Sequence, residues 1–257
     1  MKLTGRFAMM SILLGVSCFV QTQVSGAGGE SNIQLEKMPG ALEVRLALSA
    51  LPPHLRDDAT VYTLDPTKGY MLNRQGTNGM NCLVIRTEWE WPQLAFRDDI
   101  FIPISFDSEG SKKIMPIWFD SAKLRARGLT PKQVYEQITK KIHEGDYPKP
   151  TRAGISYMVA PLMRTYPAPS AQEVMTMNMP HYMFYGPDHV TDADIGGKPF
   201  SHEPFILVQG PTDYIIHLAG ETEKVKILED SKGLLADLCS YRAYLCAKQE
   251  SHDHSSS

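Results

Sequence analysis

The densest set of candidate metal ligands lies in residues 174–183, which read VMTMNMPHYM. From position 175 onward, every second residue carries a thioether or an imidazole: Met175, Met177, Met179, His181 and Met183. In an extended strand such positions share one face. Thioethers and imidazole are ligands that suit Cu(I). The spacing therefore predicts a possible copper(I) site made by Met177, Met179, His181 and Met183.

A structural explanation fits the same residues. Tyr182 and Phe184 would point to the other face of the strand, so that both faces are apolar, as in the centre of a sheet. Methionine fills irregular core space well, and Pro180 interrupts any continuous strand. Core packing is the simpler interpretation, and copper binding is the more specific hypothesis.

Cys82 is the candidate nucleophile. It follows the turn-forming residues GTNG at 76–79, whose backbone amides could stabilise an oxyanion. A histidine, with His181 as the first choice, could act as its base in an exported hydrolase or transferase. The motifs of known cysteine proteases are absent, and a single cysteine in a strand is commonly a small buried apolar residue.

A polar loop holds several residues of types that bind zinc: His189, Asp192, Asp194 and His202. Thr191 favours a different role for this loop, because it can cap a short helical turn within 191–197.

Other candidate groups have a structural alternative too. His217 alternates with apolar residues and fits a buried strand position with a hydrogen-bond partner. His252 and His254 could hold a metal adventitiously in the polar C-terminal tail. Trp89 and Trp91 could stack on a sugar or form a partner surface, or they could pack between strands.

The N-terminus predicts export. Lys2 and Arg6 precede an uncharged apolar run of 14 residues at 7–20, which is shorter than the roughly 20 residues of a bilayer span. Small residues at 24–26 then provide a cleavage site before Ala27, so residues 1–26 read as a secretory signal peptide. Lipidation at Cys18 is an alternative that its flanking residues do not favour. No later stretch is predicted to span a membrane.

Charge excludes one class of function. Removing Lys2 and Arg6 with the signal changes the formal charge from −3 to −5. Such a mildly acidic chain without a basic stripe lacks the electrostatic features of a nucleic-acid-binding protein. Phosphate-binding loops, a Gly-x-Ser-x-Gly turn, His-Glu-x-x-His and Cys-x-x-Cys are absent as well, which removes several common enzyme classes.

Three cysteines remain after processing: Cys82, Cys239 and Cys246. An exported protein can form disulfides, but an odd number leaves at least one thiol unpaired in a monomer. If 231–249 is one helix, two turns separate Cys239 from Cys246 by about 10.5 Å, which is too far for a disulfide. Cys239 and Cys246 are expected to pair with each other only if that helix breaks. Otherwise Cys82 could pair with one of these two cysteines, or all three could be buried thiols.

The remaining pattern indicates interspersed strands and helices. A short helix is expected within 41–51 and a well-capped one at 130–144, where Thr130 and Pro131 begin it and Gly145 ends it. Strands with turn residues between them predict an antiparallel meander at 60–88, a buried strand at 153–160 and a hairpin at 204–219. This arrangement predicts an α+β fold with a largely antiparallel sheet built from hairpins, a few packed helices and long loops.

The predicted organisation is a signal peptide and one domain. Residues 27–59 form an N-terminal segment with a short helix, residues 60–248 form a single α+β domain, and residues 249–257 form a disordered polar tail.

Several sequence blocks resemble a family of exported bacterial proteins of uncharacterised function. The blocks are RQGTNGMNC at 74–82, RAGISYMVA at 152–160, PHYMFYGPDHVTDADIGG at 180–197 and PFILVQG at 204–210. They include the patterns GTNGxxC and PHxMFYxP, and they cover most of residues 60–219. The resemblance implies a shared fold and a signal peptide, and it implies no activity, cofactor or catalytic residue.

The sequence thus favours an exported, soluble, periplasmic or secreted protein without catalytic function. Its ligand would be a small molecule, a metal or a protein partner, bound through its loops. Copper is the cofactor that the residues suggest, and the Cys82 enzyme is the alternative.

Overall fold

The computed structural model describes residues 35–167, 171–198 and 203–246. The predicted signal peptide with Cys18, the predicted tail with His252 and His254, and His202 lie outside these residues. The elements follow in chain order: α1 Gly40–Ser49, η1 Pro53–Leu55, β1 Thr60–Asp65, β2 Gly69–Arg74, β3 Asn81–Ile85, β4 Ile102–Phe106, α2 Gly110–Lys113, α3 Met115–Ala126, α4 Pro131–Glu144, β5 Gly154–Met158, β6 Met163–Thr165, β7 Met175–Met177, β8 His181–Tyr185, α5 Asp192–Ile195, β9 Phe205–Gln209, β10 Thr212–Leu218, α6 Glu221–Asp230, α7 Lys232–Tyr241 and η2 Ala243–Leu245.

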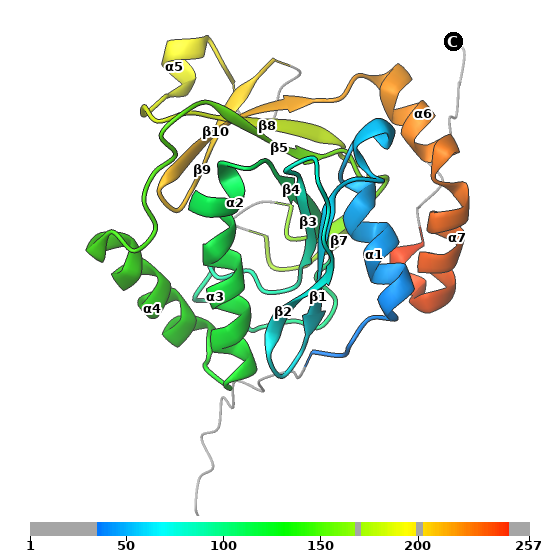
Figure 1. Ribbon diagram of the computed structural model, residues 1–257, viewed down its shortest axis with the longest axis horizontal. Helices are drawn as coiled ribbons and strands as arrows, with labels where there is room; N and C mark the ends of the chain where they lie inside the picture. Colours follow the sequence, from blue (N-terminus) through cyan, green and yellow to red (C-terminus); the bar gives the residue numbers. More distant parts are fainter. Residues whose placement is uncertain (1–34, 168–170, 199–202, 247–257) are drawn as a thin grey trace, which may run out of the picture.

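The fold is α+β, with sheets that are mostly antiparallel, as the sequence predicts. Two four-stranded sheets have the orders β2-β1-β3-β4 and β5-β8-β10-β9, and β6 pairs with β7 in a small third sheet. The first sheet lies between α1 and α3, while the second lies at one end of the molecule beside β4 (Figure 1). Within the described residues, none of the helices is both long and apolar enough to cross a membrane.

The central strand β3 explains why the first sheet is covered on both faces. Cys82 and Val84 point toward a core cluster with Leu42 and Leu46 of α1. Leu83 and Ile85 point the other way, into the main core that α3 also lines. A strand buried on both faces needs the continuous apolar run that residues 82–85 supply.

The expected helix at 130–144 is confirmed as α4. The Thr130 hydroxyl accepts a hydrogen bond from the Gln133 N–H, and the Gln133 side chain accepts one from the Thr130 N–H. This reciprocal cap satisfies two backbone donors at the helix start. Gly145 ends the helix with a φ of 81°, a left-handed conformation that glycine adopts without a steric penalty.

The expected antiparallel meander at 60–88 is wrong in one pairing. β1 and β2 form the predicted hairpin, but β3 pairs with β1 in parallel. The connection at 75–80 runs back along the start of β1, where Thr77 and Asn78 donate to the Asp58 carbonyl. A Cβ at Gly76 would lie 2.2 Å from that carbonyl oxygen, so only glycine fits this return path.

The interpretation of 174–183 as one strand is also wrong. Residues Met175–Met177 form β7, which pairs with β6, while His181 begins β8 in the second sheet. The break falls at Asn178–Pro180, where the Asn178 side-chain amide donates to the Pro161 carbonyl at 2.5 Å. Proline lacks the N–H that a continuous ladder would need.

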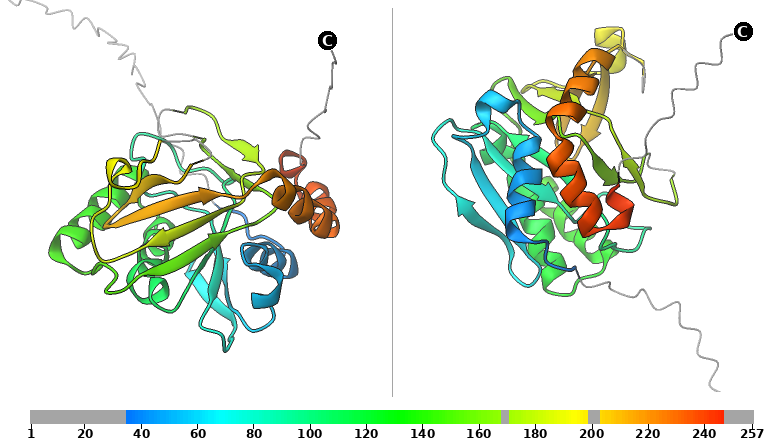
Figure 2. Two further views of the ribbon diagram at one scale, coloured as in Figure 1. Left: turned by 90° about the horizontal axis from the view of Figure 1, so that it is seen from above. Right: turned by 90° about the vertical axis from the view of Figure 1, so that its right-hand side faces the viewer.

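The expected closing helix at 231–249 ends early. α7 stops at Tyr241, and the chain turns through η2. This break brings the Cα atoms of Cys239 and Cys246 to 4.2 Å, and the two residues form a disulfide. Figure 2 shows α7 beside α1, and an ion pair between Arg45 and Asp237 joins the two helices. We call residues 239–246 the C-terminal hook.

Candidate functional site

The loop between β3 and β4, residues 86–101, buries an unusual number of polar side chains. Arg86, Thr87 and Asp99 are each at most 5 % exposed. Loops normally keep such groups in water, and charged side chains are rarely buried unless they are paired. The burial of these groups makes the loop a candidate site. We call it the β3–β4 loop.

Arg125 of α3 holds the β3–β4 loop at two points. Its guanidinium donates to the carbonyls of Arg86 and Arg97, both at 2.8 Å, and it lies 4.6 Å from the centre of the Phe96 ring. Burial, followed by the nearby charge of Arg86, lowers the pKa of Arg125 to about 9. The cationic form of Arg125 is thus costly here, and an anion nearby would stabilise it.

Arg86 adds a second buried cation. Its guanidinium lies 3.9 Å from the centre of the Phe101 ring and donates to the Asp98 carbonyl at 2.6 Å. Among the described residues it has no ion pair with a carboxylate, and its buried Nε has no hydrogen-bond partner. Stacking on an aromatic ring offsets part of the cost of burying this charge.

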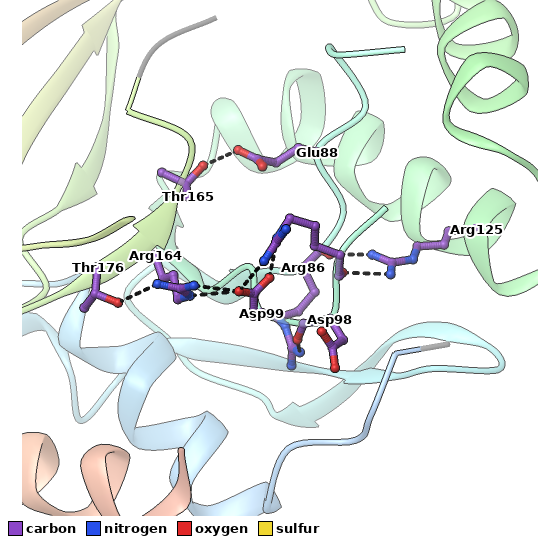
Figure 3. Close-up of polar contacts among 9 residues, drawn as sticks. Arg86, Glu88, Asp98, Asp99, Arg125, Arg164, Thr165 and Thr176 are labelled. Atoms are coloured by element: carbon purple, nitrogen blue, oxygen red, sulfur yellow. Dashed lines mark hydrogen bonds and ion pairs between the residues drawn. The ribbon is translucent and has the colours of Figure 1, made fainter. Parts of the chain in front are cut away.

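Asp99 joins the loop to the rest of the molecule. Its carboxylate accepts hydrogen bonds from Arg97 at 2.6 Å and from Arg164 of β6 at 2.6 Å. Desolvation acts to raise the pKa of Asp99, but the two guanidinium groups outweigh it and hold that pKa below its ordinary value. Figure 3 shows Asp99 facing Arg164, which also reaches Thr176 of β7.

The C-terminal hook completes this network. Arg164 lies 4.8 Å from the centre of the Tyr244 ring. The Thr176 hydroxyl donates to the Tyr244 carbonyl at 2.5 Å. Four chain segments far apart in sequence thus meet around Arg164: the β3–β4 loop, β6, β7 and the hook.

Glu88 is the acidic group of the site. Its Oε1 accepts a hydrogen bond from the Thr165 hydroxyl, while its buried Oε2 has no hydrogen-bond partner in the described part of the chain (Figure 3). Burial, with a smaller contribution from the charge of Glu90, raises the pKa of Glu88 to about 8. The carboxyl is therefore mainly protonated at neutral pH and can donate a hydrogen bond.

A pocket lies against the loop, with about 10 Å³ of enclosed space, which is room for about one water molecule. Aromatic and charged side chains line it together: Glu88, Trp91, Phe96, Arg97, Arg125 and Tyr166. Trp91 and Tyr166 meet edge to face, with ring centres 5.0 Å apart. Apolar walls with a few convergent polar groups are typical of small-molecule sites.

A larger hollow, with about 120 Å³ of enclosed space, lies between η1 and α6. Its charged and polar side chains already satisfy one another, because Lys226 pairs with Asp230 and the Tyr182 hydroxyl donates to Glu223. A charged ligand would therefore gain little from the side chains of this hollow.

Cys82 does not meet the requirements of a nucleophile. It is fully buried in the cluster beneath α1, and burial raises the pKa of its thiol to about 12. Reactive cysteines instead have lowered pKa values and some exposure. No described hydrogen bond joins its sulfur to an imidazole, and His181 lies in the other large sheet.

The proposed copper ligands do not share one strand: Met177 ends β7, Met179 lies in the connection, and β8 contains the other two. Met177 and Met179 are half-buried against the main core, whereas His181 and Met183 lie on the buried face of β8. The His181 Nδ1 lies 2.8 Å from the Met179 carbonyl oxygen.

The other predicted groups have structural partners. Asp194 accepts hydrogen bonds from the N–H and hydroxyl of Thr191, which confirms the capped turn, and Asp192 accepts one from the Ile206 N–H. His189 pairs with Asp213. Within residues 35–167, 171–198 and 203–246, no three His, Cys, Asp or Glu side chains are grouped to hold a metal ion.

The expectations for His217 and for the two tryptophans, Trp89 and Trp91, need correction. His217 is exposed on β10 rather than buried, with its ring tilted toward Tyr182 at 6.4 Å. Trp89 and Trp91 do not share one surface: Trp89 is buried near Tyr135, while Trp91 lines the pocket.

Sequence reasoning missed the arginines and Glu88 because isolated charged residues have no motif. One signal was present: Arg86 and Glu88 directly follow the apolar strand β3 and alternate with Trp89 and Trp91. Charged residues inside an apolar stretch are expected to be buried with partners or to serve a site. No protein-family model, curated protein or solved structure matches this chain.

Proposed function

We propose that this chain is an exported, non-catalytic binding protein that takes up a small organic carboxylate in the pocket beside the β3–β4 loop. One observation carries the proposal. Glu88, whose raised pKa keeps its carboxyl mainly protonated and whose buried Oε2 has no partner among the described residues, lines the pocket together with Arg97 and Arg125.

Electrostatics favours an anionic ligand. Neutral Glu88 adds no negative charge and can donate a hydrogen bond to a ligand oxygen. Arg125 is buried and its cation is held at a cost, which a ligand carboxylate would reduce. Asp99 neutralises part of Arg97, so a single negative charge on the ligand suits the site better than several.

The walls favour a ligand with an apolar body. Trp91, Phe96 and Tyr166 offer ring surfaces, and aromatic pairs contribute about 0.5–1.5 kcal/mol beyond the burial of their area. The enclosed space of the pocket is only about 10 Å³, which is room for about one water molecule. A compact aromatic or branched aliphatic monocarboxylate therefore matches the charge and the ring surfaces, and it can enter only if the side chains at the mouth of the pocket move apart.

The disulfide supports the exported part of the proposal. Cys239 and Cys246 pair within the C-terminal hook, and stable disulfides are rare in reducing cytosol. The hook in turn contacts Arg164, which positions Asp99 beside Arg97.

Titration with benzoate, and with benzamide as its neutral counterpart, tests the proposal by calorimetry at low salt near pH 6.5. We expect saturable binding of benzoate and at least about tenfold weaker binding of benzamide, because a lost charge-assisted hydrogen bond costs about 1.5–3 kcal/mol.

Arg97→Gln should weaken benzoate binding, since Arg97 lines the pocket and its side chain is 38 % exposed. Arg152→Gln is the matched control, because Arg152 is an exposed arginine that pairs with Glu109 outside the pocket. Equal affinities for benzoate and benzamide, or equal effects of the two substitutions, would contradict carboxylate binding at this pocket.

A further inference from the structure

The register of β5 against β8 places a methionine beside His181 that lies outside segment 174–183. Met158 and His181 are direct antiparallel partners. Opposite residues of an antiparallel pair point to the same face and have Cβ atoms about 4.5–5.5 Å apart. Met158 is 8 % exposed and His181 is 4 % exposed, so this shared face is the buried one.

Two further methionines lie close to His181 in the sequence. Met183 lies two residues after His181 on β8 and is therefore on the same buried face. Met179 lies two residues before it and packs against the main core, to which Met158 and Met183 also belong. Met177 is different, because its partner is Met163 in the β6–β7 sheet.

The backbone orients the imidazole. The His181 Nδ1 lies 2.8 Å from the Met179 carbonyl oxygen, a contact in which Nδ1 carries the proton and donates it. The lone pair then belongs to Nε2. Histidines that bind metals almost always use their other ring N–H in this way.

From this geometry we propose that His181 Nε2 and the thioethers of Met158, Met179 and Met183 bind a soft monovalent metal ion, Cu(I). Soft thioether ligands select Cu(I) over harder ions. The set differs from the one that strand spacing suggests, because Met158 replaces Met177.

This site is independent of the carboxylate pocket. Its ligands come from β5, β8 and the residue pair before β8, whereas the pocket is built from the β3–β4 loop, α3 and the end of β6. Failure of benzoate binding would leave the metal proposal intact, and the reverse also holds.

The first test observes methionine methyl groups in the unmodified protein. The chain is labelled with [methyl-¹³C]methionine and titrated with Ag(I), a redox-inert analogue of Cu(I). We expect the methyl signals of Met158, Met179 and Met183 to shift together until one equivalent is bound, with the Met177 signal unchanged. Assignment follows from single Met→Leu variants. Absence of shifts, or shifts that include Met177 and exclude Met158, would overturn the proposal.

The second test measures Cu(I) affinity by anaerobic competition with the chelator bicinchoninate. Met158→Leu should lower the affinity about tenfold or more, because it removes a ligand. Met177→Leu is the matched control and should change it by less than about twofold, since exchange of Met for Leu keeps the volume of the side chain. Equal affinities for the two variants would show that Cu(I) is held elsewhere, for example by Cys82, and would overturn the site. The Ag(I) titration still decides the matter if Met158→Leu fails to fold.

Discussion

At the residue scale, three glutamates with raised pKa values contribute to the pH response of the fold. Burial raises the pKa of Glu43 and Glu90 to about 7 and that of Glu88 to about 8. Glu43 accepts a hydrogen bond from the Leu64 N–H, but its second oxygen is buried without a partner. Below its pKa, each folded carboxyl is therefore mainly protonated, and in that form one of its oxygens becomes a hydrogen-bond donor.

These raised pKa values determine whether the free energy of unfolding rises or falls with pH. An unfolded glutamate loses its proton near pH 4.5, whereas folded Glu88 keeps it to about pH 8. Between these pH values the folded state binds more protons, so the free energy of unfolding falls as the pH rises. The shift sets an upper limit of about 5 kcal/mol for the contribution of Glu88 to this loss.

We predict that Glu88→Gln removes part of this pH dependence. Glutamine keeps a neutral polar group of similar size and cannot ionise. Urea unfolding at pH 5.5 and pH 8.5 should show a smaller loss of stability in Glu88→Gln than in the wild type. The control is Glu136→Gln on the exposed face of α4. If Glu88→Gln loses as much stability over this range as the Glu136→Gln control, Glu88 does not carry a raised pKa.

At the element scale, the sequence predicted those helices and hairpins whose caps and turns are stabilised by neighbouring residues. α4 carries its own caps, its proline at the first turn and its terminal glycine, so its ends can be read from residues 130–145. The β1–β2 hairpin is similar, because Asp65 accepts hydrogen bonds from Thr67 within the turn itself. Such elements are specified within a few neighbouring residues.

Elements that depend on distant contacts could not be predicted in the same way. The parallel pairing of β3 with β1 depends on the fit of Gly76 against Asp58, which no strand pattern reveals. The division of 174–183 depends on β6 and β5 as separate partners. The candidate pocket was missed for the same reason, since Arg125 and Tyr166 reach it from other parts of the chain.

The C-terminal hook supplies the prediction at this scale. Its disulfide closes a short loop, and the chain-entropy model gives a stabilisation of about 2.5 kcal/mol for a loop of this length. Leu245 is fully buried in the cluster with Leu238, so loss of the disulfide also loosens core packing. We expect reductant to lower the free energy of unfolding of the wild type by about this amount.

The double variant Cys239→Ser/Cys246→Ser separates the disulfide from other effects of reductant. It should start from the lower stability and should not respond to dithiothreitol in urea unfolding. Cys82 is present in both proteins as a free buried thiol and therefore cancels in the comparison. A wild type whose stability is unchanged by reductant would contradict the structural role of the hook.

At the scale of the whole molecule, the arginine network connects regions that the sheets leave separate. The first sheet supplies Asp99 through the β3–β4 loop, the small sheet supplies Arg164 and Thr176, and the hook supplies Tyr244. Breaking a buried ion pair by removing one partner costs about 3–5 kcal/mol. The pocket is therefore attached to a part of the molecule that these contacts cross-link, so that its backbone is held in place while the side chains at its mouth must move to admit a ligand.

The C-terminal hook also connects the fold to the compartment in which the chain works. If residues 1–26 direct export, the Cys239–Cys246 disulfide forms after translocation, and the mature chain keeps Cys82 as its one free thiol. We expect periplasmic material from a bacterial host to have a mass that begins near Ala27 and to react with one equivalent of thiol reagent after unfolding without reductant. A variant with Leu14→Arg, which places a charge in the apolar run, should stay in the cytosol with its signal attached. Wild-type protein that remains cytosolic, keeps residues 1–26 and has all of its thiols reduced would show that export is wrong, and the oxidised hook would then have no compartment in which to form.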